Sequence, residues 1–267
     1  MAKTFDKYLK YALEDLQKLF TDCANNNKVF YSRQLEIIFE GKYFHWITNR
    51  AVRELIESGF LNTETHTIRN SGEINLVWHK SSRNYKRSAK NVLSLVEEYS
   101  NNLISYEIGS YAEDKVLEAF AMNKFLLEAR GANEFKGYKW ISSNHDLDFI
   151  FSKDGIDYGI EVKNMLGYMD KNEFDLKRDI CHTLNIIPIF VYRMLPKNWI
   201  DELADYGGFS LIMKYQFYPY YLKEIAKKIR DELGLPVDSP KKIEDGTMRR
   251  VLNWHNKNVE KKKNQQN

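Results

Sequence analysis

The segment at residues 145–164 constrains the fold more than any other part of the chain. It reads HDLDFIFSKDGIDYGIEVKN. Its Asp154-Gly155 pair is a strong signal for a two-residue β-hairpin turn, and apolar residues alternate with polar ones on either side of that turn. The segment therefore predicts two antiparallel strands joined at residues 154–155.

The register of this hairpin brings charged side chains together. Counting outwards from a two-residue turn sets Asp148 opposite Glu161, and Asp146 opposite Lys163. Directly opposed side chains share a face, with Cβ atoms roughly 5 Å apart. We expect the other face of the first strand to be apolar, with Leu147, Phe149 and Phe151.

Carboxylates and a lysine in this arrangement suit a particular chemistry. Two carboxylates within about 4–6 Å repel each other, and one tends to protonate unless a cation lies between them. Mg²⁺ prefers oxygen ligands and usually keeps waters and phosphate oxygens as well. A lysine on the same face can orient or help deprotonate an attacking water and stabilise charge that develops on phosphorus.

The pattern of Asp148, a gap of twelve residues and then Glu161-Val162-Lys163 resembles the PD-(D/E)XK nuclease superfamily. That superfamily includes restriction endonucleases, archaeal Holliday-junction resolvases and many repair nucleases. The resemblance covers about residues 105–215, where we expect the helix, three strands, helix and strand of the family's core. It implies an α/β fold with a restriction-endonuclease-like mixed sheet flanked by helices.

The same resemblance implies roles for individual residues. Asp148, Glu161 and the backbone carbonyl of Val162 would hold Mg²⁺, for which Mn²⁺ would substitute, and Lys163 would be the catalytic lysine. Many members carry a further glutamate on the preceding helix, and Glu113 is the matching residue. The neighbours of Glu113 on its helical face are apolar, namely Val116, Leu117 and Phe120. A carboxylate on such a face is costly unless it is paired or bound to a metal.

Some features leave alternatives open. Leu147 precedes Asp148, where the family's name calls for proline, and Asp146 lies on the same face and is an alternative metal ligand. On a helix expected at about residues 171–184, Lys177 and Arg178 are candidate contacts for the scissile phosphate, or simply part of an exposed helix face. A solvated hairpin or a nuclease-like domain without activity is the alternative for the whole site.

The N-terminal region predicts a separate module. Helices are expected at residues 5–23, 33–39 and 45–58, followed by a two-stranded hairpin that ends near residue 78. This order of elements resembles a winged helix. The resemblance implies DNA contacts from the third helix, by Thr48, Asn49, Arg50 and Arg53. A solvated helix face or a protein-binding winged helix is the alternative.

The charge is unevenly distributed along the chain. The total of 40 Lys and Arg against 37 Asp and Glu gives a net charge of +3. Residues 241–267 carry eight basic and three acidic residues, a net +5, so residues 1–240 together carry −2. A second basic stretch at residues 80–90 offers further candidate DNA contacts, namely Arg83, Lys86 and Arg87.

These patterns divide the chain into four expected parts. We expect a winged-helix DNA-binding domain at residues 1–80, a basic linker and helix at 81–104, a nuclease domain at 105–235 and a basic C-terminal tail at 236–267. No apolar run approaches the roughly 20 residues that span a bilayer. The N-terminus lacks the apolar core of a signal peptide, and two distant cysteines make a disulfide scaffold or cysteine metal site a poor fit. We therefore expect a cytoplasmic protein without membrane contact.

The main functional prediction is a Mg²⁺-dependent DNA endonuclease of restriction, repair or junction type. Cutting both strands needs two sites, so a homodimer fits this prediction. A nucleotide cofactor is not expected, because the sequence has no phosphate-loop or dinucleotide fingerprint. The alternatives are a winged-helix DNA-binding regulator with an inactive nuclease-like domain, and a nuclease directed at RNA.

Overall fold

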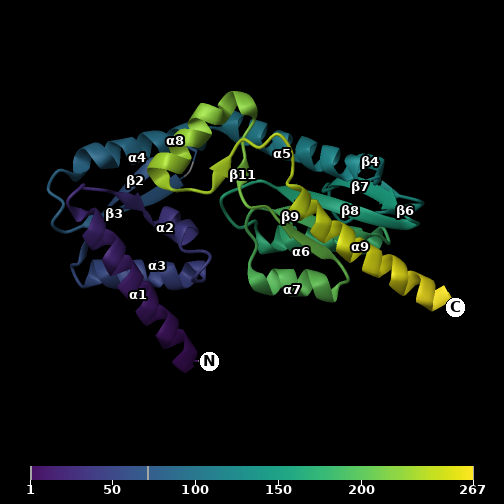
Figure 1. Ribbon diagram of the computed structural model, residues 1–267, viewed down its shortest axis with the longest axis horizontal. Helices are drawn as coiled ribbons and strands as arrows, with labels where there is room; N and C mark the ends of the chain where they lie inside the picture. The colour runs from purple at the N-terminus through teal and green to yellow at the C-terminus, as the bar shows by residue number, and fades with distance from the viewer. Residues whose placement is uncertain (1, 71, 267) are drawn as a thin grey trace. The chain divides into compact units, whose positions relative to one another are not determined.

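The computed structural model describes residues 2–70 and 72–266 (Figure 1). These residues form two compact units. The first unit contains the chain up to Ser105 together with Glu224–Leu235, and the second contains Tyr106–Lys223 and the chain from Pro236 onwards. None of the helices in the described part of the chain is long and apolar enough to cross a membrane.

The first unit combines helices with a small antiparallel sheet in the order β1-β3-β2. Its elements are α1 (Ala2–Ala24), β1 (Phe30–Tyr31), α2 (Ser32–Ile38), α3 (His45–Glu57), β2 (Leu61–Ile68), β3 (Gly72–His79), α4 (Tyr85–Tyr99) and α8 (Lys223–Leu233). In α1 and α3 the apolar residues recur at helical spacing, so each helix has one apolar face. These two faces are buried and form the core of the unit. Gly59, with a φ of 69°, lies just after α3, where a left-handed residue commonly ends a helix.

The second unit is built on a mixed five-stranded sheet in the order β10-β9-β8-β7-β4. Its strands are β4 (Leu126–Ala132), β7 (Leu147–Lys153), β8 (Ile156–Lys163), β9 (Ile187–Tyr192) and β10 (Phe209–Ile212). The β8, β9 and β10 strands are parallel, whereas β7 is antiparallel to both β4 and β8. Two short pairs lie outside this sheet: β5 (Glu134–Phe135) with β6 (Tyr138–Lys139), and β11 (Gln216–Phe217) with β12 (Val237–Asp238).

Helices cover both faces of the five-stranded sheet (Figure 1). One face packs against α5 (Asn102–Met122) and α9 (Asp245–Gln266), and the other against α6 (Lys171–Thr183) and α7 (Lys197–Asp205). A 3₁₀ turn at Tyr220–Leu222 precedes α8. The expected mixed sheet flanked by helices is therefore present.

The hairpin has the predicted register. Lys153 pairs with Ile156, and the ladder continues to Phe149 and Ile160. Asp154 and Gly155 both have positive φ angles, 49° and 73°, as a type I′ turn requires. The face assignment of Leu147 was wrong, however: Phe149 and Phe151 pack in the core below α5, whereas Leu147 packs in the core below α6.

Two regions differ from the sequence-based boundaries. The sequence alone predicts the first helix of the core at about residues 109–129, but in the structure this helix ends at Met122, and residues after it form β4, which is an edge strand of the sheet. The sequence alone also predicts a core strand near residues 137–142, but only the two residues of β6 are extended there, and they lie outside the five-stranded sheet.

The C-terminal region is also different from the expected tail. It forms α9, which buries Met248, Val251 and His255 in the second unit. In contrast, α8, which was assigned to the nuclease domain, belongs to the first unit. Its last residue, Leu233, accepts a hydrogen bond of 2.7 Å from the buried Gln34 amide.

Candidate functional site

The charged residues of the hairpin meet at the end of β7 and β8 that lies away from the 154–155 turn. The backbone pairing between these strands stops at Phe149 and Ile160. Beyond that point the side chain of Asp148, in place of a backbone carbonyl, accepts a hydrogen bond from β8. Asp148 Oδ2 accepts a hydrogen bond of 2.6 Å from the Val162 N–H. Because the N–H and C=O of one strand residue point to the same side, the Val162 carbonyl also faces the Asp148 side of β8.

Glu161 is fully buried between two ammonium groups. Its Oε1 lies 3.0 Å from Lys163 Nζ, and its Oε2 lies 2.7 Å from Lys177 Nζ. These contacts are ion pairs at short range, but neither oxygen has a partner with hydrogen-bond geometry. Burial, and then the neighbouring Asp148, raise the pKa of Glu161 to about 7, in spite of the two lysines.

Lys163 is held by two carboxylates. Its Nζ contacts Glu161 on β8 and lies 2.8 Å from Glu173 Oε1 on α6. Burial alone would lower the pKa of Lys163, but the charge of Glu161, and the hydrogen bond and charge of Glu173, raise it above its usual value. The lysine is therefore protonated at neutral pH, which suits it to donate hydrogen bonds and to stabilise negative charge.

Two further carboxylates share the electrostatics of this centre. Burial raises the pKa of Asp148, although its hydrogen bond from Val162 opposes the change. Burial and then the charge of Asp148 raise the pKa of Glu113, which is half-buried on α5. Asp146 has an exposed side chain, so Asp148 is the better placed of the two alternative ligands. We call Glu113, Asp148, Glu161 and Lys163 the carboxylate centre.

The oxygen atoms of this centre are of the chemical type that binds a hard divalent cation. Carboxylate and carbonyl oxygens are the ligands that Mg²⁺ takes, and the buried Glu161 oxygens have no hydrogen-bond partner. A bound cation would also offset the charge of Asp148, which raises the pKa of Glu113 and of Glu161. Their present arrangement is not that of a closed metal site: the described residues contain no group of three or more His, Cys, Asp or Glu side chains placed to hold a metal ion.

The basic residues of α6 are not free to bind phosphate in this conformation. Lys177 is only 5% exposed and contacts Glu161. Arg178 forms ion pairs with Glu202, and with Asp175 and Asp179 at 2.9 and 3.1 Å. Both side chains therefore form ion pairs in this structure, and their contact with the scissile phosphate stays a prediction.

The four residues of α3 that we expected to contact DNA differ in how far they are buried. Thr48 is fully buried, so its placement near the exposed face was wrong. Asn49 donates a hydrogen bond of 3.0 Å to Glu36, and Arg50 pairs with Glu54 on the same helix. Arg53 is exposed and lines a polar pocket of about 230 Å³.

The basic stretch near residues 80–90 remains accessible. Arg83 is exposed ahead of α4, and Lys86 and Arg87 are exposed in its first turn. The expected order of a linker and then a helix is present, and the helix begins at Tyr85.

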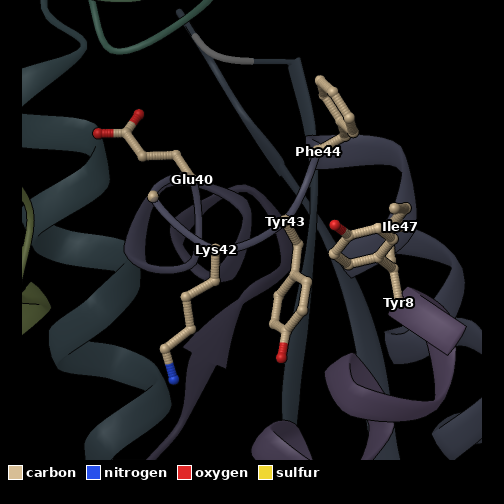
Figure 2. A pocket seen from close by; sticks show the side chains of 7 residues that line it. Tyr8, Glu40, Lys42, Tyr43, Phe44 and Ile47 are labelled. Atoms are coloured by element: carbon tan, nitrogen blue, oxygen red, sulfur yellow. The ribbon is translucent and has the colours of Figure 1, made fainter.

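The first unit also contains an aromatic pocket of about 210 Å³ (Figure 2). Its wall includes the exposed rings of Tyr8 and Phe44. Two other lining residues form hydrogen bonds with α1: Lys42 Nζ and Tyr43 Oη both donate to Asp15 Oδ2, at 2.8 and 2.9 Å. These contacts tie the segment between α2 and α3 to α1.

Sequence reasoning missed Glu173, and it named Lys177 as a phosphate contact without its contact with Glu161. Glu173 and Lys177 lie four residues apart on α6 and therefore on one face of that helix. That spacing was visible in the sequence, but nothing local showed that this face would contact Glu161 and Lys163. Sequence reasoning also missed a chain of contacts at the opposite end of β8, where the buried His255 lies 2.6 Å from Tyr158 Oη and 2.9 Å from Asp154 Oδ2.

Comparisons with known proteins do not assign this chain to a family. No protein-family model and no curated protein matches the chain. A solved structure, protein VC1899 from Vibrio cholerae, is similar at 16% identity and a TM-score of 0.26, over 86% of this chain and 53% of that chain. The chain thus spans about half the length of that protein, and a likeness at this level carries no argument about fold or function.

Proposed function

We propose that the second unit is a PD-(D/E)XK-type nuclease domain that hydrolyses phosphodiester bonds in DNA with the help of Mg²⁺. The observation that carries this proposal is the meeting of Asp148, Glu161 and Lys163 at one end of β7 and β8. The half-buried Glu113 on the neighbouring helix, whose pKa responds to Asp148, supports it.

In this proposal Asp148, Glu161 and the Val162 carbonyl would hold Mg²⁺. When bound, the ion would offset charge on the phosphoryl oxygens and make water a better nucleophile. Lys163 stays protonated, so its role is to donate a hydrogen bond and to stabilise the charge that develops on phosphorus. Glu113 has a raised pKa, which suits it to hold a proton released during hydrolysis.

We further propose that the first unit contacts duplex DNA as a winged helix. The order α1, α2, α3 and then the β2–β3 hairpin supports this assignment. The exposed Arg53, Arg83, Lys86 and Arg87 are its best candidate phosphate contacts. Double-strand cleavage would require two chains, so the proposal includes a homodimer on DNA.

The test is cleavage of plasmid, linear, branched and single-stranded DNA, and of RNA, with Mg²⁺, Mn²⁺ or EDTA. We expect cleavage of DNA that EDTA abolishes and that Lys163→Ala and Glu161→Gln reduce by at least about a hundredfold, the scale of losing one electrostatic contact to the transition state. Lys139→Ala, an exposed lysine of the same unit, is the matched control. Cleavage without metal, or full activity in Lys163→Ala, would refute the mechanism.

A DNA-binding regulator with an inactive nuclease-like domain is the second candidate. The observation that favours it is the neutralisation of Glu161 by two lysines at 3.0 and 2.7 Å. Tight DNA binding without cleavage of any substrate under all three metal conditions would support this candidate over the first.

A further inference from the structure

Helix α6 supplies a buried ammonium group to the carboxylate centre. Lys177 is 5% exposed, and its Nζ lies 2.7 Å from Glu161 Oε2. The same Nζ donates a hydrogen bond of 2.5 Å to the backbone carbonyl of Asp146. Lysine is almost never buried unless it is paired, and Glu161 on β8 is the carboxylate that Lys177 contacts from α6.

The two lysines beside Glu161 differ in their surroundings. The Lys163 side chain is 27% exposed and divides its charge between Glu161 and Glu173. The Lys177 side chain is 7% exposed, and its Nζ contacts Glu161, although its charge also lowers the pKa of Asp148. Lys177 is therefore the more buried counter-ion of Glu161, whereas Lys163 forms ion pairs with both Glu161 and Glu173.

The position of Lys177 conflicts with a bound divalent cation. A magnesium ion binds a carboxylate oxygen at about 2.0–2.1 Å. An ammonium group 2.7 Å from Glu161 Oε2 occupies the space in front of that oxygen and would repel a second cation there. The lysine stem is a flexible chain of four carbons, so the ammonium group can leave while α6 stays in place.

We propose that Lys177 is the resident cation of the carboxylate centre. Its ammonium group neutralises Glu161 in the cation-free protein, and a divalent cation binds by displacing it. This inference rests on the proposed function for the identity of the incoming cation. It adds that cation affinity is set by competition with a side chain of the protein itself.

The test is Mn²⁺ binding by isothermal titration calorimetry, without nucleic acid, at fixed pH and ionic strength. Lys177→Met keeps most of the unbranched stem and removes the charge, and Lys171→Met is the control, because Lys171 lies on the same helix but pairs with Asp175 and Glu202. We expect Lys177→Met to bind Mn²⁺ at least about tenfold more tightly, a difference of about 1.4 kcal/mol. Unchanged or weaker binding by folded Lys177→Met overturns the proposal, as does an equal gain in Lys171→Met.

Removing the ammonium group leaves the buried Glu161 with Lys163 as its remaining counter-ion, so stability is a second readout. We expect Lys177→Met to have a lower Tm than wild type without cation, and to gain more in Tm from Mn²⁺. The double variant Glu161→Gln with Lys177→Met should recover the Tm and lose Mn²⁺ binding. If Lys177→Met fails to fold with and without Mn²⁺ while the double variant folds, a cation cannot take the lysine's place and the proposal is wrong.

These outcomes separate the inference from the nuclease assignment. Tighter Mn²⁺ binding by Lys177→Met in a protein that cleaves no nucleic acid supports the resident cation and refutes the nuclease. Metal-dependent cleavage by wild type, together with unchanged Mn²⁺ affinity in Lys177→Met, supports the nuclease and refutes the resident cation.

Discussion

Gly159 on β8 is the position where one methyl group should disturb both the packing and the carboxylate centre. A Cβ atom added there would lie 2.6 Å from Cys181 Sγ, 2.8 Å from Leu147 Cδ1 and 2.9 Å from Ile186 Cδ1. Optimal separations between carbon atoms are about 3.5–4.0 Å. All three neighbours are buried, at 0, 0 and 6% exposure, so they have no solvent into which to move.

The size of the effect can be worked out from these distances. Forcing one extra methyl group into a close-packed core costs about 1–3 kcal/mol. For a domain of this size each kcal/mol lowers Tm by about 2–4 °C, so Gly159→Ala should lower the Tm of the second unit by about 2–12 °C. We also expect the clash with Cys181 to push α6 away from β8 and to lengthen the contact between Lys177 and Glu161.

The assay is thermal and urea unfolding followed by circular dichroism. Cys181→Ala removes the closest of the clashing atoms, so in a double-mutant cycle it should recover part of the loss caused by Gly159→Ala. Gly109→Ala on α5 is the matched control, because no atom lies within 4 Å of its added Cβ. It should keep or raise stability, since alanine favours a helix interior over glycine.

Two results would refute this reasoning. One is a Gly159→Ala variant whose free energy of unfolding is within about 0.5 kcal/mol of wild type, the range of harmless surface changes. The other is simple additivity of Gly159→Ala and Cys181→Ala, which would mean that the two sites do not share a contact.

Two further predictions concern pH and the C-terminal helix. The pKa of Glu161 is raised to about 7 in the folded protein from its usual value of 4.5, so the folded state binds more protons and the stability that this group contributes falls as pH rises between those values. Glu161→Gln should remove that loss, so its stability relative to wild type should be greater at pH 8 than at pH 4.5 in urea unfolding; an equal difference at both pH values would contradict the assignment. Deleting residues 241–267 should unfold the second unit, because Val251 and His255 are fully buried there. A truncated protein with native circular dichroism and an unchanged Tm would show that α9 is dispensable.

The parts of the fold that depend on short-range patterns could be predicted. The Asp154-Gly155 pair determined the turn because few other residues adopt two positive φ angles in succession, and counting from it gave the register from Lys153 to Phe149. The meeting of Asp148 with Glu161 followed from that register. The position of Leu147 did not, because it lies beyond the last backbone pair of the ladder.

Strand β4 could not be predicted, because its residues favour a helix. The sequence Leu126-Leu127-Glu128-Ala129-Arg130 is made of strong helix formers. In the structure Lys124 has a φ of 62°, α5 ends before it, and pairing with β7 determines the conformation of the residues from Leu126 onwards. Tertiary pairing therefore overrode local propensity.

The packing of helix α9 was not predicted, because its high charge suggested a solvated segment. Its lysines and arginines suggested a solvated tail, yet Met248, Val251 and His255 are buried at intervals of three and four residues. This helical spacing was present in the sequence, and it outweighs net charge as an indicator of packing. The contacts of Glu173 and Lys177 with β8 could not be predicted in the same way, because they depend on how α6 docks onto the sheet.

The path of the chain also has a consequence for how this protein is made. The polypeptide leaves the second unit for α8 and returns, and the exit and return points are joined by the parallel pair β11 and β12. Domains generally fold as they emerge during synthesis, but here the first unit lacks α8 until Leu233 has been translated, and the second lacks α9 until residues 245–266 have been translated. Neither unit is therefore encoded by one continuous stretch, and a ribosome that stops at residue 220 releases two incomplete units rather than one finished domain.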